Sequence, residues 1–235
     1  MGEKVILVYL VVCFFVFLAG FVDSIAGGGG LISLPAYMIA GLPVHTAIAT
    51  NKMSSFMGTS VATYHYMKKG FMKWKICIPA IFGAIAGSWM GSHLALLISD
   101  RVLKIAMVIV LPVILFYVLR SKALQGNDEN TTDAVNGMLI FKCILIAVVI
   151  GIYDGIYGPG TGTFLMLLFT GFCHMTLNDA AGTTKAINLT TNITALVVFL
   201  INGKVLLHWE LLRAAVIWQE TILEVTVLHQ MVIRS

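Results

Sequence analysis

Long apolar runs separated by short clusters of charged residues dominate the chain. Between residues 5 and 67 only two charged residues occur, and between residues 143 and 203 only three. The others gather mainly around 68–75, 100–104 and 120–133. A helix needs about 20 mainly apolar residues to cross the hydrocarbon core of a bilayer. The pattern therefore predicts spanning helices near 5–26, 45–66, 76–98, 102–119, 138–157 and 179–201.

Two further apolar stretches, 31–41 and 162–173, are too short to cross a bilayer alone. Each follows a segment rich in glycine. Such stretches are typical of broken or re-entrant helices, in which irregular backbone lines a cavity inside the protein. The sequence thus predicts about seven or eight membrane segments. It leaves open whether the two halves of the chain run parallel or inverted, because this depends on whether the short stretches cross or re-enter.

The composition identifies the class of protein. Of the 235 residues, 59% are hydrophobic and 11% are charged, whereas a soluble domain carries about 25% charged residues. Such a chain is neither disordered nor a soluble globular enzyme. We predict an all-α integral membrane protein, a polytopic helical bundle that crosses the cell membrane several times. The net charge of +4 is too small and too scattered to indicate nucleic-acid binding.

The basic residues predict the orientation in the membrane. Four lysines lie in the loop 67–75, and two crossings later the hydrophilic segment 121–137 follows. Because Lys and Arg concentrate in cytoplasmic loops, we expect both loops on the cytoplasmic side. Residues 5–21 fit a span better than a signal peptide, because they are long for its apolar region and lack a convincing A-x-A cleavage site.

The two halves of the chain resemble each other. The run A-G-F-V-D-S-I-A-G-G-G-G-L at 19–31 aligns with I-G-I-Y-D-G-I-Y-G-P-G-T-G at 150–162, and T-A-I-A-T-N-K at 46–52 aligns with D-A-A-G-T-T-K at 179–185. Each half thus keeps one aspartate, one glycine-rich break and, about 30 residues after the aspartate, one lysine. This predicts a first transmembrane repeat, the cytoplasmic loop and an incomplete second repeat, at 1–120, 121–137 and 138–217.

Internal repeats whose helices break at corresponding positions are the strongest sequence pointer to the substrate site of a transporter. A helix that restarts after a glycine-rich break presents backbone N–H groups and the positive end of its dipole, which favours an anion. Glycine lets a substrate approach the backbone, while Thr, Asn and Lys add donors and positive charge. The predicted anion-binding residues are Gly28, Gly29, Gly30, Thr50, Asn51, Lys52, Gly158, Gly160, Thr161, Gly162, Thr183, Thr184 and Lys185.

Four further residues are candidates for proton coupling or gating. Asp23 and Asp154 lie within predicted spans, where a carboxylate is paired or functional. His45 and His174 follow the short segments, and histidine is a residue type that can relay protons. Alternatives stay open: the glycines can serve helix packing, the lysines and histidines can lie at an interface, and each Asp can pair with a Lys within one repeat or across repeats. No catalytic residue, metal site or cofactor is predicted.

At these residues the chain resembles the sulfite exporter TauE/SafE family of membrane permeases. The motifs that carry the resemblance are D-S-I-A-G-G-G-G-L-I-S-L-P, G-L-P-V-H-T-A-I-A-T-N-K, Y-D-G-I-Y-G-P-G-T-G and A-G-T-T-K, and the likeness extends from about residue 5 to 215. The resemblance implies a duplicated, multi-spanning protein that moves sulfur-containing anions such as sulfite, sulfoacetate and related organosulfonates across the cytoplasmic membrane.

The leading hypothesis is a secondary transporter, an exporter of small sulfur-containing or related organic anions, and not an enzyme. A negative-inside potential favours outward anion movement by about 2.3 kcal/mol per charge per 100 mV. One alternative is a cation or metal permease with the two Asp and two His as ligands, against which the paired lysines argue. A weaker one is a membrane enzyme that uses the aspartates as paired carboxylates. The expected partners are the small anion and the lipid bilayer, and a homo-oligomer is left open.

The C-terminus departs from the family pattern. After Trp209 the family continues with a small-residue helix, whereas this chain places Glu220 and Glu224 there. Codons for residues 217–226, read one base earlier, can spell x-A-G-N-Y-I-G-S-Y, which resembles G-A-I-A-G-S-W-M-G at 83–91. We therefore predict that residues 218–235 are an aberrant tail that arose from a frameshift or sequencing error. The coding DNA tests this, since a single-base change should restore an apolar, glycine-containing frame.

Overall fold

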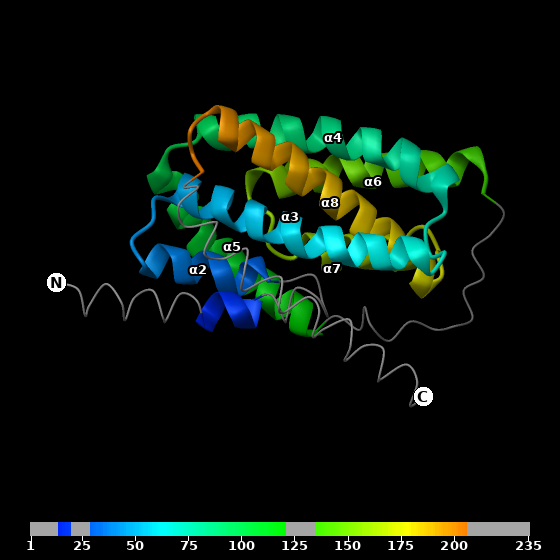
Figure 1. The fold of residues 1–235 in the computed structure, drawn as a ribbon, viewed down its shortest axis with the longest axis horizontal. Coiled ribbons are helices and arrows are strands. Elements are labelled where there is room, and N and C mark those ends of the chain that lie inside the picture. The colour runs from blue at the N-terminus through cyan, green and yellow to red at the C-terminus, as the bar shows by residue number, and fades with distance from the viewer. Residues whose placement is uncertain (1–13, 20–28, 121–134, 206–235) are drawn as a thin grey trace.

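The computed structural model describes residues 14–19, 29–120 and 135–205. The described residues are helical apart from short loops, which confirms the all-α class (Figure 1). Every labelled helix begins and ends within two residues of the range predicted for it. Most of the predicted span 5–26, and all of the tail 218–235, lie outside the described residues. Besides a helical stretch at 14–19, the helices are α2 (Gly30–Ile39), α3 (Val44–Lys68), α4 (Trp74–Leu97), α5 (Asp100–Arg120), α6 (Gly137–Ile156), α7 (Thr161–Gly171) and α8 (Leu177–Ile201).

Helix lengths and surfaces fit a bilayer. Within the described part of the chain, α4, α6 and α8 are long and apolar enough to cross a membrane. By contrast α2 and α7, at 10 and 11 residues, reach only about half of a 30 Å hydrocarbon core, since a helix rises about 1.5 Å per residue. Large apolar side chains such as Phe82, Val108 and Phe141 are exposed on the outside, a surface that suits lipid rather than water.

Small residues join α4 to α6. A Cβ atom built on Gly87 would lie 2.2 Å from the carbonyl oxygen of Val148, and one on Gly91 would lie 2.1 Å from that of Ile152. Because contacts advance along both helices together, α4 and α6 run parallel. Close approach of this kind, through glycine, is how membrane helices gain packing contacts without a hydrophobic driving force.

The long helices α3 and α8 run in opposite directions. The hydroxyl of Thr63, late in α3, donates to the carbonyl oxygen of Lys185, early in α8, over 3.1 Å. Conversely Ile48, early in α3, shares a hydrophobic cluster with Phe199, late in α8. Figure 1 shows the same opposition in the colour gradients of the two helices. This is the arrangement that an inverted repeat would require of the two helices that carry the lysines.

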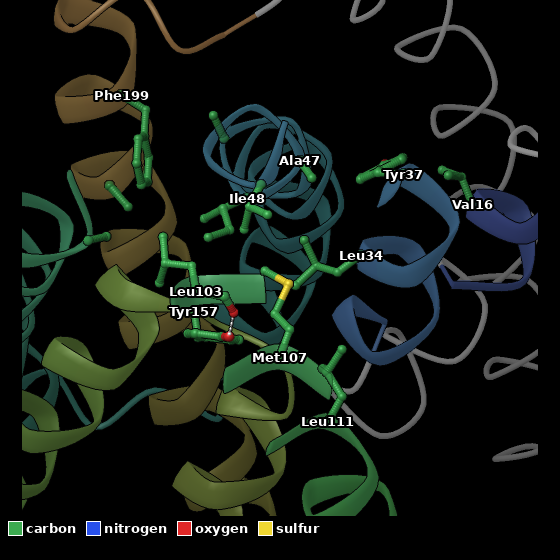
Figure 2. Close-up of a cluster of buried hydrophobic side chains, with 14 residues drawn as sticks. Val16, Leu34, Tyr37, Ala47, Ile48, Leu103, Met107, Leu111, Tyr157 and Phe199 are labelled. Atoms are coloured by element: carbon green, nitrogen blue, oxygen red, sulfur yellow. Dashed lines mark hydrogen bonds between the residues drawn. The ribbon is translucent and has the colours of Figure 1, made fainter. Parts of the chain in front are cut away.

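A buried apolar cluster closes one side of the bundle. Figure 2 shows that it draws side chains from α2, α3, α5 and α8 together with Tyr157, which directly follows α6. The hydroxyl of Tyr157 donates to the carbonyl oxygen of Leu103 inside this cluster. The labelled members are Val16, Leu34, Tyr37, Ala47, Ile48, Leu103, Met107, Leu111, Tyr157 and Phe199. This hydrogen bond and the packing hold the backbone next to Tyr157, between α6 and α7, against the buried side chains of the cluster.

The arrangement makes the predicted orientation testable. The α3–α4 connection and the start of α6 lie at one end of the bundle, and the end of α8 lies at the other (Figure 1). Cysteines introduced at Lys69 and in the predicted loop at Asn127 should resist an impermeant thiol reagent added outside intact cells. A cysteine at Lys204, exposed beyond α8, should react. Reaction at Lys69 and Asn127 but not at Lys204 would reverse the orientation.

Candidate functional site

The first turn of α2 and the segment before α7 meet inside the bundle. A Cβ atom built on Gly30, the first residue of α2, would lie 3.2 Å from the Cα of Pro159. Pro159 in turn precedes Gly160, the N-cap of α7, whose φ of 78° lies in the left-handed region that favours glycine. The glycines of the two sequence breaks therefore bring together helix N-termini from the two halves of the chain.

A fully buried ion pair lies beside this junction. Lys52 Nζ of α3 is 2.7 Å from Asp154 Oδ2 of α6, and the side chains are only 1% and 2% exposed. The sequence left open whether each Asp pairs within its own repeat or across repeats. Lys52 belongs to the first half of the chain and Asp154 to the second, so this ion pair joins the two halves.

Gly158 and Thr161 shape the surroundings of the pair. A Cβ atom on Gly158, whose φ is 95°, would lie 2.7 Å from Lys52 Nζ and 3.1 Å from Asp154 Oδ1. The absent side chain thus makes room for the ion pair. The Thr161 hydroxyl donates to Asp154 Oδ1 over 2.6 Å, while Oδ2 lies against the Lys52 ammonium. Thr161 is the first residue of α7, which ties the ion pair to the restart of the helix.

Asn51 extends the group of donors toward α2. Its side-chain oxygen accepts a hydrogen bond of 2.6 Å from the Ser33 hydroxyl, and its Nδ2 would lie 3.2 Å from a Cβ atom on Gly30. The bond from Ser33 orients the amide so that its N–H groups point to the start of α2. Ser33 was not among the predicted site residues, although it stands one turn after Gly29 in the glycine-rich motif.

Three further buried hydroxyl groups lack hydrogen-bond partners among the described residues. They belong to Thr50 and Ser54, one turn apart on α3, and to Thr184 on α8. Hydroxyls inside helices commonly donate to the carbonyl four residues back, as Ser60 does to Phe56. Buried polar groups without a partner are rare, so these three are available to a polar ligand. Sequence reasoning missed Ser54, whose spacing from Thr50 was the signal.

The remaining predicted residues make other contacts, cap or line the short helices, or lie outside the described part. The Thr183 hydroxyl is 3.6 Å from Cys77 Sγ, and Lys185 is half-buried on the same helix. Gly29 caps α2, and Gly162 is buried in the first turn of α7. Asp23 and Gly28 fall outside the described residues.

The two histidines are not part of this group. His45 Nδ1 contacts Asp100 Oδ1, and its Nε2 is 2.9 Å from the carbonyl oxygen of Ala95, so it links the start of α3 to the end of α4 and the start of α5. His174 lies beyond the far end of α7 with a φ of 50°. In the ranges that the structure describes, no three His, Cys, Asp or Glu side chains gather to hold a metal ion.

Comparisons with known proteins agree on one class. The family model described as sulfite exporter TauE/SafE matches residues 12–219. The chain is 36% identical over 190 residues to "Probable membrane transporter protein ORF9" of Sinorhizobium sp., an alignment that covers 81% of this chain and 71% of the relative. It is 34% identical over 197 residues to "Probable membrane transporter protein YfcA" of Escherichia coli K12, with coverages of 83% and 71%. No solved structure gives a significant match.

Proposed function

This chain belongs to the sulfite exporter TauE/SafE family of membrane transporters, and we propose that it exports small sulfur-containing or related organic anions such as sulfite and sulfonates. The proposal rests on one observation above the others. The buried cation Lys52 lies where helix N-termini from the two halves of the chain converge. A positive site at the centre of a membrane transporter is suited to a small anion.

The donors around the junction share one sign. Each helix N-terminus is equivalent to roughly half a positive charge, and its first N–H groups have no partner within the helix. Lys52 adds a full charge, Asn51 adds amide donors, and the Thr50 hydroxyl is buried without a partner among the described residues. Oxygen atoms of a sulfite or sulfonate group accept hydrogen bonds in several directions, so they match such a set of donors.

The antiparallel course of α3 and α8 supports alternating access. If the halves are inverted repeats, Thr183, Thr184 and Lys185 form the second half of the binding region, reached when the bundle reorients. Asp154, together with Asp23, His45 and His174, would then couple or gate the movement, and the protein would be a carrier rather than an enzyme. Outward movement of an anion is favoured by the negative-inside membrane potential.

Transport by the purified chain in proteoliposomes tests the proposal. Vesicles loaded with ³⁵S-labelled sulfite or with methanesulfonate are given a potassium diffusion potential, negative inside. We expect efflux above that of protein-free vesicles, faster with the potential than without it, because a net negative charge leaves. A parallel set uses a version of the chain in which the reading frame after residue 217 has been repaired.

Competition separates this function from its alternatives. Unlabelled sulfonates should slow the efflux, and carboxylates should slow it less if the site selects sulfur oxyanions. Inhibition by divalent metal ions together with metal uptake would instead identify a metal permease. Chemical conversion of the anion without flux would indicate an enzyme. The absence of flux from both versions of the chain, with every probe, would refute anion transport.

A further inference from the structure

The carboxylate of Asp154 holds the position that a substrate oxyanion would take. Its Oδ2 is 2.7 Å from Lys52 Nζ, and its Oδ1 accepts from the first residue of α7. One oxygen on the lysine and one at a helix N-terminus is also the contact pattern expected of a bound sulfonate or sulfite. Asp154 is therefore an anion tethered within the site, and an incoming anion must compete with it for Lys52.

The charges explain why such a competitor is needed. With Asp154 in place, the formal charges of the buried pair cancel, and a substrate-free protein carries no net charge across the bilayer at this point. Without the carboxylate, Lys52 would be a buried cation, which is strongly unfavourable in a low-dielectric interior. A protein in that condition would be stable only with an anion bound, and could not reorient empty.

The same charges indicate the class of substrate. Lys52 and the two helix N-termini together supply about two positive charges, which balance Asp154 and one further negative charge. A monoanion therefore completes the balance, whereas a dianion leaves one negative charge uncompensated. A monoanion that crosses with the protein carries one net negative charge, and the membrane potential acts on this charge.

From this geometry we infer that Asp154 is the internal counter-ion of the empty transporter: it neutralises Lys52 so that the substrate-free protein can recross the membrane, and it yields Lys52 to a monoanion such as a sulfonate. The inference rests on the proposed anion transport. It assigns Asp154 to the return of the empty protein, and not to the crossing of the loaded one. Net efflux requires both steps, whereas exchange of internal for external anion requires only the second.

Two fluxes measured on one variant separate these steps. In Asp154→Asn, net efflux of methanesulfonate from proteoliposomes should fall by roughly 100-fold, because reorientation of the empty site would carry an unpaired buried charge. Exchange of internal for external methanesulfonate should stay within about twofold of the parent protein. The anion should also raise the melting temperature of the variant more steeply than that of the parent, because it replaces the lost counter-ion.

Two further variants make the comparison specific. Thr161→Val removes the hydrogen bond to Asp154 Oδ1 without removing a charge, and should lower net efflux about tenfold and exchange by a smaller factor. It also serves if Asp154→Asn does not fold. Asp179→Asn makes the same chemical change in an ion pair of the same length, 2.7 Å to Lys73, where the Lys73 side chain is 35% exposed. This control should leave the ratio of the two fluxes unchanged.

The outcomes are distinguishable. Loss of net efflux with retained exchange in Asp154→Asn, or a larger loss of net efflux than of exchange in Thr161→Val, supports the counter-ion role. Equal losses of both fluxes in folded protein overturn it while anion transport stands, and so does net efflux that persists in both variants. If the parent protein shows neither flux with methanesulfonate or sulfite, the proposed function fails, and the counter-ion role fails with it.

Discussion

Replacement of Lys52 with Gln is expected to destabilise the protein by about 3–5 kcal/mol, since it leaves a buried carboxylate without its partner. It should also abolish anion flux, because it removes the cation of the site. The Asp154 side chain is 2% exposed, so water cannot take over the role of the lysine. Thermal unfolding in detergent, followed by size-exclusion chromatography, measures the first effect, and efflux from proteoliposomes measures the second. Lys73→Gln is the matched control. Its ion pair with Asp179 has the same length but is more exposed, and such pairs contribute at most about 1 kcal/mol.

The double change Lys52→Gln and Asp154→Asn decides whether the pair serves the site or only the fold. Both charges are then gone, and an amide pair can keep a hydrogen bond, so most of the lost stability should return. Anion flux should not return, because the Lys52 cation is gone from the junction of α2 and α7. Recovery of flux together with stability would show that the ion pair is structural, and the site assignment would be wrong.

The sequence predicted the helices well because membrane segments are marked by an absence of charge. Charged clusters at both ends of each apolar run limit where a span can begin or end, and this placed α4 within two residues at each end. The half-length helices were equally visible, since α2 and α7 each follow a cluster of glycines. Both signals lie within short stretches of the sequence, so they can be recognised without knowing how the helices pack.

The contacts within the site were less accessible. The predicted repeat places one Asp and one Lys in each half, but spacing along a helix does not say which helix faces which. Only the packing of α3 against the α6–α7 junction shows that Lys52 meets Asp154 of the other half. The histidines are a second case, because their position after the short segments suggested a shared role but not their contacts. The structure places His45 against Asp100, at the start of α3.

Glycine packing gives the second large effect that we expect. Gly87→Val should prevent folding, because even a Cβ atom at this position would lie 2.2 Å from the carbonyl oxygen of Val148. The obstacle is the backbone of α6, which cannot rotate away as a side chain would. The two helices must separate, which removes the close contacts that hold them together in a bilayer. We expect a loss of at least about 3 kcal/mol and aggregated rather than monodisperse protein after extraction.

Gly58→Ala is the control that separates this packing from the general effect of a larger residue. Gly58 lies in the interior of α3, and a Cβ atom there would have no heavy atom within 4 Å. Because alanine favours a helix over glycine, this change should leave stability unchanged or raise it by up to about 1 kcal/mol. The helices α4 and α6 belong to different halves of the chain. Comparison of Gly87→Val with Gly58→Ala therefore also tests whether the two halves pack together through this contact. Monodisperse, thermally stable Gly87→Val protein would contradict the parallel packing of α4 on α6, and with it the position of Asp154 at the end of α6.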